Sequence, residues 1–479
     1  MKIARNAVHA VTGGVIIRSP HTPLLRWLGL LAMIGLGPAA AIGQNPSPVP
    51  PQLASYNRAA DPHPFTVFHQ EGGWCWYQDP RSIVSGDHLF IGAVQGNGSG
   101  AALVGVYDLA RNQRLGSVVL RDHFDHDDHN SPVFHARPDG SVLAVYARHG
   151  RDFRHHYRIS DPHNPLEWTE EKVFTHDHPG AGKITYMNLI DMSSENLLYN
   201  FYRGIEFNPS LIVSRDQGST WETPTHFIAS ELEGRHRPYA RYAGNGTDSV
   251  HVSFTDGHPR NFGNSIYYTV FRDGNFHRAD GTVIKNLAKD GPLRPSESER
   301  VYQGTGNPDR GHGLSAVGAA WTSSMALDQD GHPHIGYTLY HANDDNRYRL
   351  ASWDGRAWID REVAYAGNCL YEQEASYTGL ITTDPVDPTV VFISTDVNPS
   401  TGEFTGGRHE IYRAWITADD DIHSIVWHPV TRNSPVRNLR PMVLRTDEKR
   451  IVLWNRGDFV TYTDYQLDTV GLIEDVSID

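Results

Sequence analysis

Hydrophobic and polar residues alternate in short runs along most of the chain, and glycine, aspartate, asparagine and proline separate one run from the next. Alternation with a period of two is typical of a β-strand that buries one face, whereas a helix repeats every three to four residues. The helical pattern is nearly absent from this sequence. We therefore predict an all-β fold built from short antiparallel strands.

The strands recur as a repeated unit. In residues 131–150, SPVFHARPDGSVLAVYARHG, a first strand is followed by a turn and by a second strand that ends in polar residues. Copies of this unit lie at 81–96, 131–150, 188–204, 240–258, 325–344, 379–398 and 442–457. A spacing of roughly 55 residues, lengthened by a Gly/Pro-rich insertion at about 285–320, is typical of four-stranded propeller blades. These copies predict a seven-bladed β-propeller that forms one domain over residues 61–479.

One hairpin of the third unit carries an Asp box, SRDQGSTW, at 214–221. We expect Asp216 and Gly218 to shape the turn and Trp221 to pack beneath it. This motif supports the fold and carries no information about a ligand.

The start of the chain differs from the rest. Basic residues precede an apolar run at 27–42, and small residues follow it, which is the pattern of a secretory signal peptide. The run is interrupted by Gly35 and Pro38 and is shorter than the roughly 20 apolar residues that span a bilayer. We predict a signal peptide at 1–43, a Pro-rich spacer at 44–60, and a mature protein that is periplasmic or secreted.

Composition narrows the classes of ligand. The formal net charge is −14, and acidic and basic residues are mixed along the chain, which disfavours nucleic acid and membrane surfaces as partners. An anionic ligand would need a local positive pocket, to which the 27 histidines and 22 tyrosines could contribute. Cys75 and Cys369 are the only cysteines, so the fold does not rest on a disulfide framework. The two thiols could form one disulfide or bind a metal.

The repeat places certain residues on one rim of the predicted propeller. In each unit the first strand starts, and the second ends, at the end opposite the hairpin turn, so residues at these two places converge. In the second to fourth units these places hold His129, Asn130, His149, Tyr186, Asn188, Arg203, Arg237, Tyr239, Tyr242, Asp256 and His258. Each has an ordinary explanation when taken alone; His129, for example, lies in an acidic run that could be a solvated loop. Their convergence is what indicates a functional site.

The residue types on this rim favour β-elimination over hydrolysis. Glycoside hydrolysis uses two carboxyl groups that flank the bond, and the rim supplies mainly Asp256 and the acidic run before His129. Elimination at a uronic acid requires a cation that neutralises the carboxylate, a base for the C5 proton and an acid for the leaving O4. Arg203 suits the first role, because a planar guanidinium binds a carboxylate with two hydrogen bonds. Tyrosine and histidine suit the other two roles, and a tyrosine beside Arg203 could have a lowered pKa.

Several segments resemble a known family. They are GGWCWYQDPRSI at 72–83, DDHNSPVF at 127–134, TYMNLIDMSSENLLYNFYRG at 185–204, RPYARY at 237–242 and YTGLITTDPVDPTVVFISTD at 377–396. Together they are similar to the BNR-repeat-containing family of seven-bladed propellers. That family includes propeller-type ulvan lyases and related lyases that cut rhamnosyl-α-1,4-glucuronate linkages.

The resemblance implies roles for individual residues. His129 and His149 would be the paired active-site histidines, Tyr186 the base and a candidate for the acid, and Arg203 the group that neutralises the carboxylate. The resemblance further implies that Asn130, Asn188, Tyr239 and Tyr242 contact the substrate and that Arg237 binds a sulfate or a second uronate. It also implies a structural zinc, for which Asp256, His258 and Cys369 are the matching ligands, with no fourth ligand identified. No cofactor is expected for catalysis, and we expect a monomer.

The predicted function is a polysaccharide lyase that acts by β-elimination on an anionic polymer of rhamnose and glucuronate, with ulvan as the leading substrate. One alternative is an α-L-rhamnosidase, because the same propeller family has a hydrolase branch that uses a histidine from the first-blade segment. This sequence has Gln78 in that region, which counts against the hydrolase. A second alternative, from a different class, is a sugar-binding propeller without catalytic activity.

Overall fold

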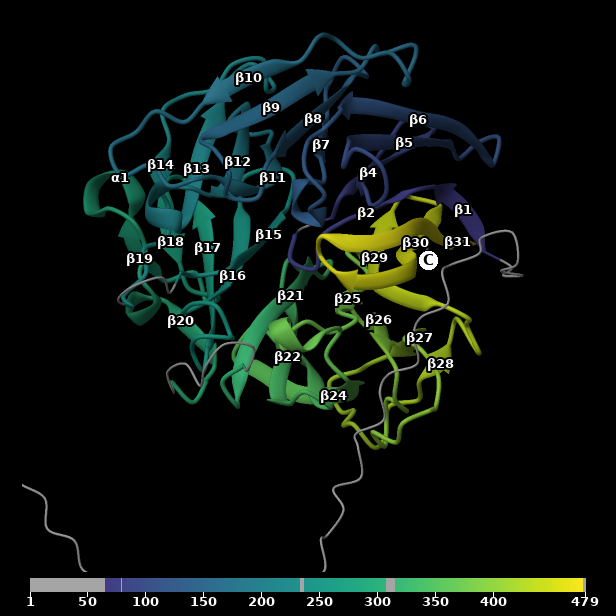
Figure 1. The fold of residues 1–479 in the computed structure, drawn as a ribbon. Coiled ribbons are helices and arrows are strands. Elements are labelled where there is room, and N and C mark those ends of the chain that lie inside the picture. Colours follow the sequence, from purple (N-terminus) through teal and green to yellow (C-terminus); the bar gives the residue numbers. More distant parts are fainter. Residues whose placement is uncertain (1–64, 79, 233–236, 307–314, 477–479) are drawn as a thin grey trace, which may run out of the picture. The chain divides into compact units, whose positions relative to one another are not determined.

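The computed structural model describes residues 65–78, 80–232, 237–306 and 315–476. The predicted signal peptide at 1–43 and the predicted spacer at 44–60 lie outside these residues. The described chain forms seven antiparallel sheets arranged around a common centre, with one edge strand of each sheet innermost (Figure 1). The prediction of an all-β, seven-bladed propeller is confirmed.

The first four sheets follow one another along the chain. The first contains β2 (Gly72–Gly73), β3 (Ser82–Ser85), β4 (His88–Gln95), β5 (Ala102–Asp108) and β6 (Gln113–Arg121). The second contains β7 (Val133–Ala136), β8 (Val142–Ala147), β9 (Arg154–Ile159) and β10 (Lys172–Thr175). The third contains β11 (Thr185–Met192), β12 (Leu197–Arg203), β13 (Pro209–Ser214) and β14 (Thr225–His226). The fourth contains β15 (Ala240–Gly244), β16 (Val250–Thr255), β17 (Ile266–Arg272), β18 (Asn275–His277), β19 (Val283–Asn286) and β20 (Glu299–Tyr302).

The last three sheets complete the ring. The fifth contains β21 (Ala319–Leu327), β22 (Pro333–Ala342), β23 (Asp345–Trp353) and β24 (Trp358–Gly367). The sixth contains β25 (Ile381–Thr383), β26 (Val390–Thr395), β27 (Glu410–Trp415) and β28 (His428–Pro429). The seventh contains β29 (Arg437–Arg445), β30 (Lys449–Thr461), β31 (Asp464–Asp475) and β1 (Thr66–His69). Each repeated unit found in the sequence therefore corresponds to the two inner strands of one sheet.

The ring is closed by a strand from the other end of the described chain. β1 pairs antiparallel with β31, with Thr66 opposite Gly471 and Val67 opposite Val470. The seventh sheet thus takes three strands from the C-terminal part of the protein and its outermost strand from the N-terminal part. Closure of this kind holds the first and last sheets together and leaves no gap between them.

Helices are few and short among the described residues. They are α1 (Leu287–Asp290) and the 3₁₀ helices η2 (Asp128–Asn130), η3 (Ile205–Phe207), η4 (Pro295–Glu297) and η5 (Glu372–Glu374). None is long and apolar enough to cross a membrane. η2 and η5 lie in loops that contribute to the sites described below.

The strand β8 shows why these sequences form propeller blades. Its residues VLAVYA are all buried. Val142, Ala144 and Tyr146 pack against the first sheet, whereas Leu143, Val145 and Ala147 pack against the third sheet. A strand that is covered on both faces is apolar throughout, and burial of each valine or leucine stabilises the fold by about 1.5–3 kcal/mol.

An aromatic cluster fills the centre of the ring. The segment 74–81 connects β2 with β3, both of which pair with β4, and it carries Trp76 and Tyr77 into this centre. Trp76 packs on Trp321 with ring centroids 4.2 Å apart, and its indole N–H donates to the carbonyl of Thr378 at 2.9 Å. Tyr77 contacts the rings of Tyr186 and Tyr239, which places this cluster directly beneath the predicted site.

The Asp box has the predicted form. Oδ1 of Asp216 accepts hydrogen bonds from the Ser214 hydroxyl and from the Thr220 amide, both at 2.8 Å. Gly218 has a φ of +85°, a conformation that glycine adopts without strain. Trp221 is half-buried and packs against the cluster between the second and third sheets. The motif therefore stabilises a turn, as expected.

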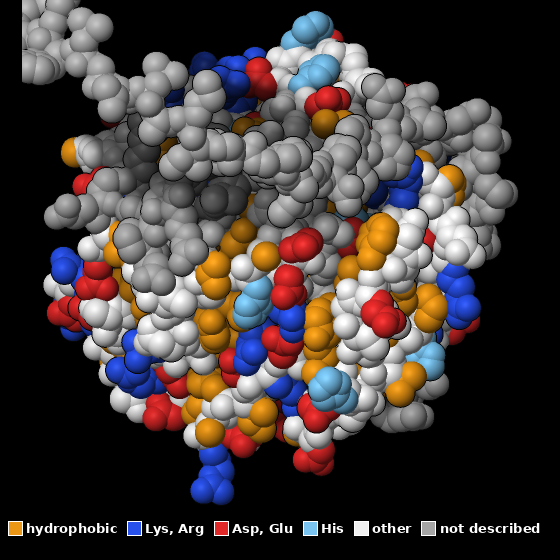
Figure 2. Space-filling model, turned by 60° about the horizontal axis from the view of Figure 1, so that its bottom comes forward, with side chains coloured by type: hydrophobic (Ala, Val, Ile, Leu, Met, Phe, Trp, Pro, Cys, Tyr) orange, Lys and Arg blue, Asp and Glu red, His pale blue; other side chains and the backbone are white. Residues whose placement is uncertain are grey.

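The surface carries both signs of charge. On the face that Figure 2 presents, Lys and Arg side chains are interspersed with Asp and Glu side chains over the described residues. This mixture agrees with the charge pattern along the sequence. A positive site for an anionic ligand must therefore be built locally.

Candidate active site

The four residues predicted to be catalytic lie together on one rim. His129 is in η2, His149 follows β8, Tyr186 is in β11 and Arg203 ends β12. The Tyr186 ring centroid is 5.6 Å from that of His129 and 6.1 Å from that of His149. Cζ of Arg203 lies 4.9 Å from the centroid of the Tyr186 ring. The second and third sheets, together with the loop that leads into the second, thus bring two imidazoles, a phenol and a guanidinium into mutual contact.

The two histidines form a stacked pair that shares one carboxylate. Their ring centroids are 3.8 Å apart and the rings are inclined by only 10°. Nδ1 of His129 donates to Oδ1 of Asp127 at 2.6 Å, and Nδ1 of His149 donates to Oδ2 of the same residue at 2.9 Å. Because both Nδ1 atoms face the carboxylate, the Nε2 atom of a neutral His149 is an acceptor.

Burial and neighbouring charges shift the pKa values of His129 and His149 in opposite directions. Burial lowers the pKa of His149 to about 4, and the positive charge of His129 adds to the effect despite the opposing attraction of Asp127. Burial opposes a charge on His129 as well, but Cys75 and Asp127 raise its pKa well above the usual range. The two histidines hold the pKa of Asp127 far below normal against the effect of its burial. These directions favour a protonated His129 and a neutral His149 at neutral pH.

Tyr186 has an unusual backbone conformation. Its φ is +63°, and the pairing of β11 with β12 shifts register between Thr185 and Asn188. The side-chain amide of Asn188 donates to the Tyr186 carbonyl at 2.7 Å and so supports this bulge. Positive φ at a residue other than glycine costs about 1–3 kcal/mol and is concentrated at functional sites.

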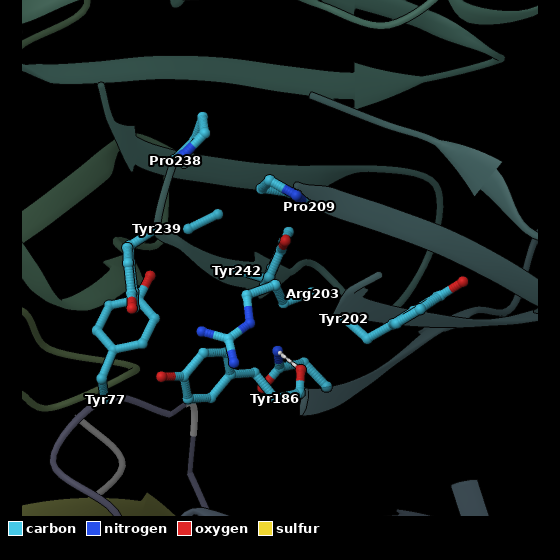
Figure 3. A pocket seen from close by; sticks show the side chains of 10 residues that line it. Tyr77, Tyr186, Tyr202, Arg203, Pro209, Pro238, Tyr239 and Tyr242 are labelled. Carbon is cyan, nitrogen blue, oxygen red and sulfur yellow. Dashed lines mark hydrogen bonds between the residues drawn. The ribbon is translucent and has the colours of Figure 1, made fainter. Parts of the chain in front are cut away.

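The pocket around Tyr186 has no acidic side chain among its described lining residues. Figure 3 shows Tyr77, Tyr186 and Tyr239 grouped around the guanidinium of Arg203. The lining residues are Tyr77, Tyr186, Asn188, Tyr202, Arg203, Pro209, Pro238, Tyr239, Ala240 and Tyr242. We call this the Arg203 pocket. Its positive charge and its aromatic walls suit an anionic sugar.

The pKa of Tyr186 is raised and not lowered, although Arg203 acts on it in the expected direction. Burial raises the pKa of Tyr186 well above its usual range, and Tyr239 raises it further, whereas Arg203 lowers it by less than these two effects. The phenol of Tyr186 therefore keeps its proton at neutral pH. In this state Tyr186 is a proton donor.

Residues to which the sequence analysis gave no role in the site hold it in place. Nη1 of Arg440 donates to Oδ2 of Asp128 at 2.7 Å, although 312 residues separate the two, and both side chains are almost fully buried. Oδ1 of Asp128 lies 3.0 Å from Nδ1 of His129. The amide of Gln78 donates to the carbonyl of His129 at 2.8 Å. The acidic run before His129 was a signal for Asp127 and Asp128, but no local pattern marks Arg440.

The predicted substrate-binding residues occupy different environments. The amide of Asn130 donates to the carbonyl of Phe124 at 3.0 Å, and its Oδ1 accepts from the backbone N–H of His149 at 2.7 Å. Asn130 and Asn188 are both buried and hydrogen bonded within the protein, so they stabilise the site, and their contact with substrate stays a prediction.

The other three predicted binding residues belong to the segment just before or within β15. Tyr239 and Tyr242 line the Arg203 pocket. Tyr242 also stacks on Phe201 with ring centroids 4.4 Å apart, which makes it part of the core between the third and fourth sheets. Nε of Arg237 donates to the carbonyl of Glu206. A role for Arg237 in binding sulfate or a second uronate stays a prediction.

The predicted zinc ligands Asp256, His258 and Cys369 do not form a metal site within the described residues. The two oxygens of Asp256 accept hydrogen bonds from the Ser265 amide at 2.8 Å and the Tyr267 hydroxyl at 2.9 Å. Nδ1 of His258 accepts a backbone N–H at 3.0 Å. Burial raises the pKa of Cys369 to about 11, whereas zinc binds the thiolate. These residues do not fit a structural zinc.

Other groups of metal-ligating side chains were not predicted. Within the described residues they are Cys75–Asp128–His129, Asp127–His129–His149 and Asp328–Asp330–His332. The first two overlap the histidine pair. In the first, the guanidinium of Arg440 already neutralises Asp128, which disfavours a second cation there. Cys75 and Cys369 are both free thiols in this structure.

The fold and the site define a class: a seven-bladed β-propeller with a histidine pair, a tyrosine and an arginine converging on one rim. Residues 75–366 match the model of the BNR repeat-containing family, and the protein belongs to this family. No curated protein matches the chain in sequence.

Solved structures of other proteins share the fold. A PL25 ulvan lyase superposes with a TM-score of 0.60 at 14% identity, covering 85% of this chain and 95% of its own. A second structure of a PL25 ulvan lyase, bound to -[GlcA(1-4)Rha3S]-, gives a TM-score of 0.59 at 14% identity over the same shares of the two chains. The polysaccharide lyase Uly1 gives a TM-score of 0.55 at 10% identity, covering 86% of this chain and 92% of its own. At these identities the likeness establishes a common architecture.

Proposed function

We propose that this protein is a polysaccharide lyase that cleaves a uronate-containing polymer by β-elimination. The observation that carries the proposal is the contact of Arg203 with Tyr186 beside the neutral His149. The Arg203 pocket and the histidine pair beside it together offer a cation for a carboxylate, a proton donor and a proton acceptor. These are the three groups that elimination at a uronic acid requires.

Arg203 binds the uronate carboxylate. Its guanidinium lies in a pocket whose described lining residues carry no acidic group, so its charge is available to an anionic sugar. Neutralising the carboxylate makes the C5 proton more acidic and stabilises the negative charge that develops in the transition state. Charges of both signs are mixed on the face that Figure 2 presents, so this local positive site is the feature that would select an anionic sugar.

His149 and Tyr186 move the protons. Nε2 of His149 accepts the C5 proton, while Asp127 fixes the opposite ring nitrogen as a donor and stabilises the imidazolium that forms. The electron pair of the C5–H bond becomes the C4=C5 double bond, and the C4–O4 bond breaks. The phenol of Tyr186 donates its proton to the departing O4. Solvent then returns a proton from His149 to Tyr186.

The assignment of Tyr186 as the acid follows from its environment. The resemblance implied that Tyr186 is the base, a role that requires a tyrosinate. Burial raises the pKa of Tyr186, which disfavours the tyrosinate, while burial lowers the pKa of His149 and favours the neutral imidazole. Both directions support His149 as the acceptor and Tyr186 as the donor.

A polymer that contains rhamnosyl-glucuronate linkages is the proposed substrate, and ulvan is the first candidate. The similarity in fold to a PL25 ulvan lyase that binds -[GlcA(1-4)Rha3S]- supports this choice. None of the described residues of the site favours the α-L-rhamnosidase. The side chain of Gln78, which lies in the segment where that branch uses a histidine, is hydrogen bonded to the His129 carbonyl and the Ser131 hydroxyl.

The decisive experiment follows the ultraviolet absorbance of the unsaturated uronate while purified protein is incubated with ulvan or with a rhamnose-capped arabinogalactan. A rise in absorbance supports elimination and identifies the polymer. Release of free rhamnose without such a rise would indicate that the protein is an α-L-rhamnosidase. No product from either polymer would leave the sugar-binding propeller as the better proposal.

Tyr186→Phe should abolish turnover, because the variant has no proton to donate to O4. The matched control is Tyr199→Phe, which removes a hydroxyl from the same pair of strands where it contacts Glu195 at 3.2 Å. Both variants should unfold at the temperature of the parent protein within a few degrees. Activity retained by Tyr186→Phe would remove Tyr186 from the mechanism.

The remaining predictions from the sequence accompany this function. A signal peptide at 1–43 would bring the enzyme to a polymer outside the cytoplasm, and N-terminal sequencing of the exported protein would locate the cleavage site. We also propose that the enzyme acts as a monomer. Light scattering at the concentration of the assay tests that proposal.

A further inference from the structure

A second hollow adjoins the histidine pair. Its described lining residues are Arg260, Tyr371, Gln373, Glu374, Thr461, Tyr462 and Thr463, and its cavity volume is about 300 Å³. We call it the Tyr371–Tyr462 groove. Ligand pockets usually enclose about 300–1,000 Å³, so the groove is large enough for a sugar unit.

The groove is continuous with the active site through Tyr462. The Tyr462 ring meets His129 edge-on with ring centroids 5.1 Å apart, and it meets His149 at 5.9 Å. Tyr462 lies in the turn between β30 and β31 of the seventh sheet. The groove therefore approaches the same histidines as the Arg203 pocket, which is built from the third and fourth sheets.

The charge of the groove is balanced internally. Nη1 of Arg260 pairs with Oε1 of Glu374, and Nε2 of His258 lies 3.8 Å from Oε2 of the same carboxylate. The side chain of Arg260 is 31% exposed and that of Glu374 is 13% exposed, so the pair is partly shielded from solvent. Arg260 is the only Lys or Arg among the described lining residues, and Glu374 neutralises it.

The two hollows therefore differ in the ligand that they accept. The Arg203 pocket has a cation and no acidic residue among its described lining residues, whereas the groove has two tyrosines, uncharged polar side chains and one neutralised ion pair. Tyrosine rings pack against the apolar face of a pyranose, and amide and hydroxyl groups bind its hydroxyls. A sulfate in the groove would lie near Glu374 and would lose water without gaining a cation.

We propose that the Tyr371–Tyr462 groove is a subsite for an uncharged, unsulfated pyranose next to the uronate, and that the Arg260–Glu374 pair sets this preference. The proposal rests on the proposed function, because the uronate is the sugar that Arg203 holds. It adds a selectivity: the enzyme binds a polymer of alternating uronate and neutral sugar better than its sulfated form.

Substitutions in the Arg260–Glu374 pair should raise or lower the affinity for a sulfated sugar, depending on which partner is replaced. Glu374→Gln keeps the shape of the side chain and leaves the charge of Arg260 without its carboxylate, so affinity for a sulfated sugar should rise. Arg260→Gln leaves Glu374 uncompensated, so that affinity should fall. The matched control is Glu362→Gln, which removes the carboxylate of another ion pair, with Arg347 at 2.6 Å in the fifth sheet, and changes the net charge by the same amount.

The measurement is calorimetric binding of one ulvan oligosaccharide fraction before and after chemical desulfation. All proteins carry Tyr186→Phe, so that no ligand is cleaved, and thermal unfolding confirms that each variant is folded. We expect the parent to bind the desulfated fraction more tightly. Glu374→Gln should shift the ratio of the two affinities towards the sulfated fraction by about fivefold, Arg260→Gln should shift it the opposite way, and Glu362→Gln should not move it.

The outcomes separate this proposal from the proposed function. A parent that prefers the sulfated fraction, a ratio that Glu374→Gln does not change, or no binding of either fraction would overturn the neutral-sugar subsite. If the wild-type enzyme cleaves the polymer by elimination and any of these results is obtained, the proposed lyase function stands and only the neutral-sugar subsite is refuted. If no elimination is seen but the affinities shift as expected, the lyase function is refuted and the neutral-sugar subsite is supported.

Discussion

Replacing Asp127 with asparagine tests whether the shared carboxylate organises the histidine pair. Asp127 accepts a hydrogen bond from Nδ1 of both His129 and His149. An asparagine side chain has one acceptor oxygen and one donor amide, so it cannot accept from both rings. One histidine must therefore change its tautomer or turn away, and the positive charge of His129 loses a buried partner.

The expected loss of activity is large. If His149 takes the wrong tautomer, its Nε2 carries a proton and cannot accept the C5 proton. In the triad of a serine protease, the equivalent change to asparagine lowers kcat by about 10⁴-fold, and we expect about 10³ to 10⁴-fold for Asp127→Asn. Steady-state kinetics on the polymer that the wild-type enzyme cleaves gives this value.

The expected loss of stability is smaller. Removing one partner of a buried ion pair costs about 3–5 kcal/mol when the other charge remains without compensation. Here Asp128 still lies 3.0 Å from Nδ1 of His129, and His129 can release its proton. We therefore expect a loss of about 1–3 kcal/mol in the free energy of unfolding, measured by urea denaturation.

Two further measurements make the test decisive. NMR titration should show that the pKa of His129 is lower in Asp127→Asn than in the wild type, a result that does not depend on activity. Asp139→Asn is the control, because Asp139 is a turn carboxylate bonded to the Ser141 amide at 3.0 Å, far from the histidines in the fold. Turnover within about threefold of the wild type in Asp127→Asn would refute the assigned role of the carboxylate.

Arg203→Ala should raise KM and lower kcat together, because the guanidinium binds the uronate and stabilises the developing charge; an unchanged kcat would limit Arg203 to ground-state binding. Leu143→Ala empties a buried position between the second and third sheets and should cost about 2–5 kcal/mol in urea unfolding, whereas a loss below about 1 kcal/mol would contradict the tight packing assigned to β8. The free energy of unfolding should also fall as the pH drops from about 6.5 towards about 3. Burial lowers the pKa of His176, which is hydrogen bonded to His155 at 2.8 Å, so the unfolded chain binds more protons than the folded one. His176→Gln should flatten this pH profile, and an unchanged slope would show that other groups cause it.

The fold could be predicted from the sequence because the information is local and repeated. Each copy of the unit contains alternation, a turn and a polar end, and strands such as β8 are apolar throughout because neighbouring sheets cover both faces. The convergence of His129, His149, Tyr186 and Arg203 followed from the same repeat. Their catalytic roles remain predictions that the experiments above test.

Other features could not be predicted because they depend on distant residues or on burial. Arg440 and Tyr462 reach the histidine pair from the seventh sheet, and nothing in the local sequence connects them with Asp128 or His129. The expected effect of Arg203 on Tyr186 had the right sign, but the larger effect of burial is visible only in three dimensions. Asp256, His258 and Cys369 were predicted as zinc ligands from their residue types. A metal site also requires that the ligand atoms lie close together, which the sequence does not show.

The closure of the ring has a consequence for when the protein becomes active. The seventh sheet is complete only when β1 pairs with β31. The support beneath the histidine pair is complete only when Arg440 binds Asp128. A nascent chain that already carries His129, His149, Tyr186 and Arg203 therefore lacks a finished catalytic rim until Arg440 and β31 have been synthesised. Activity should appear late and all at once, as the final step of folding rather than sheet by sheet.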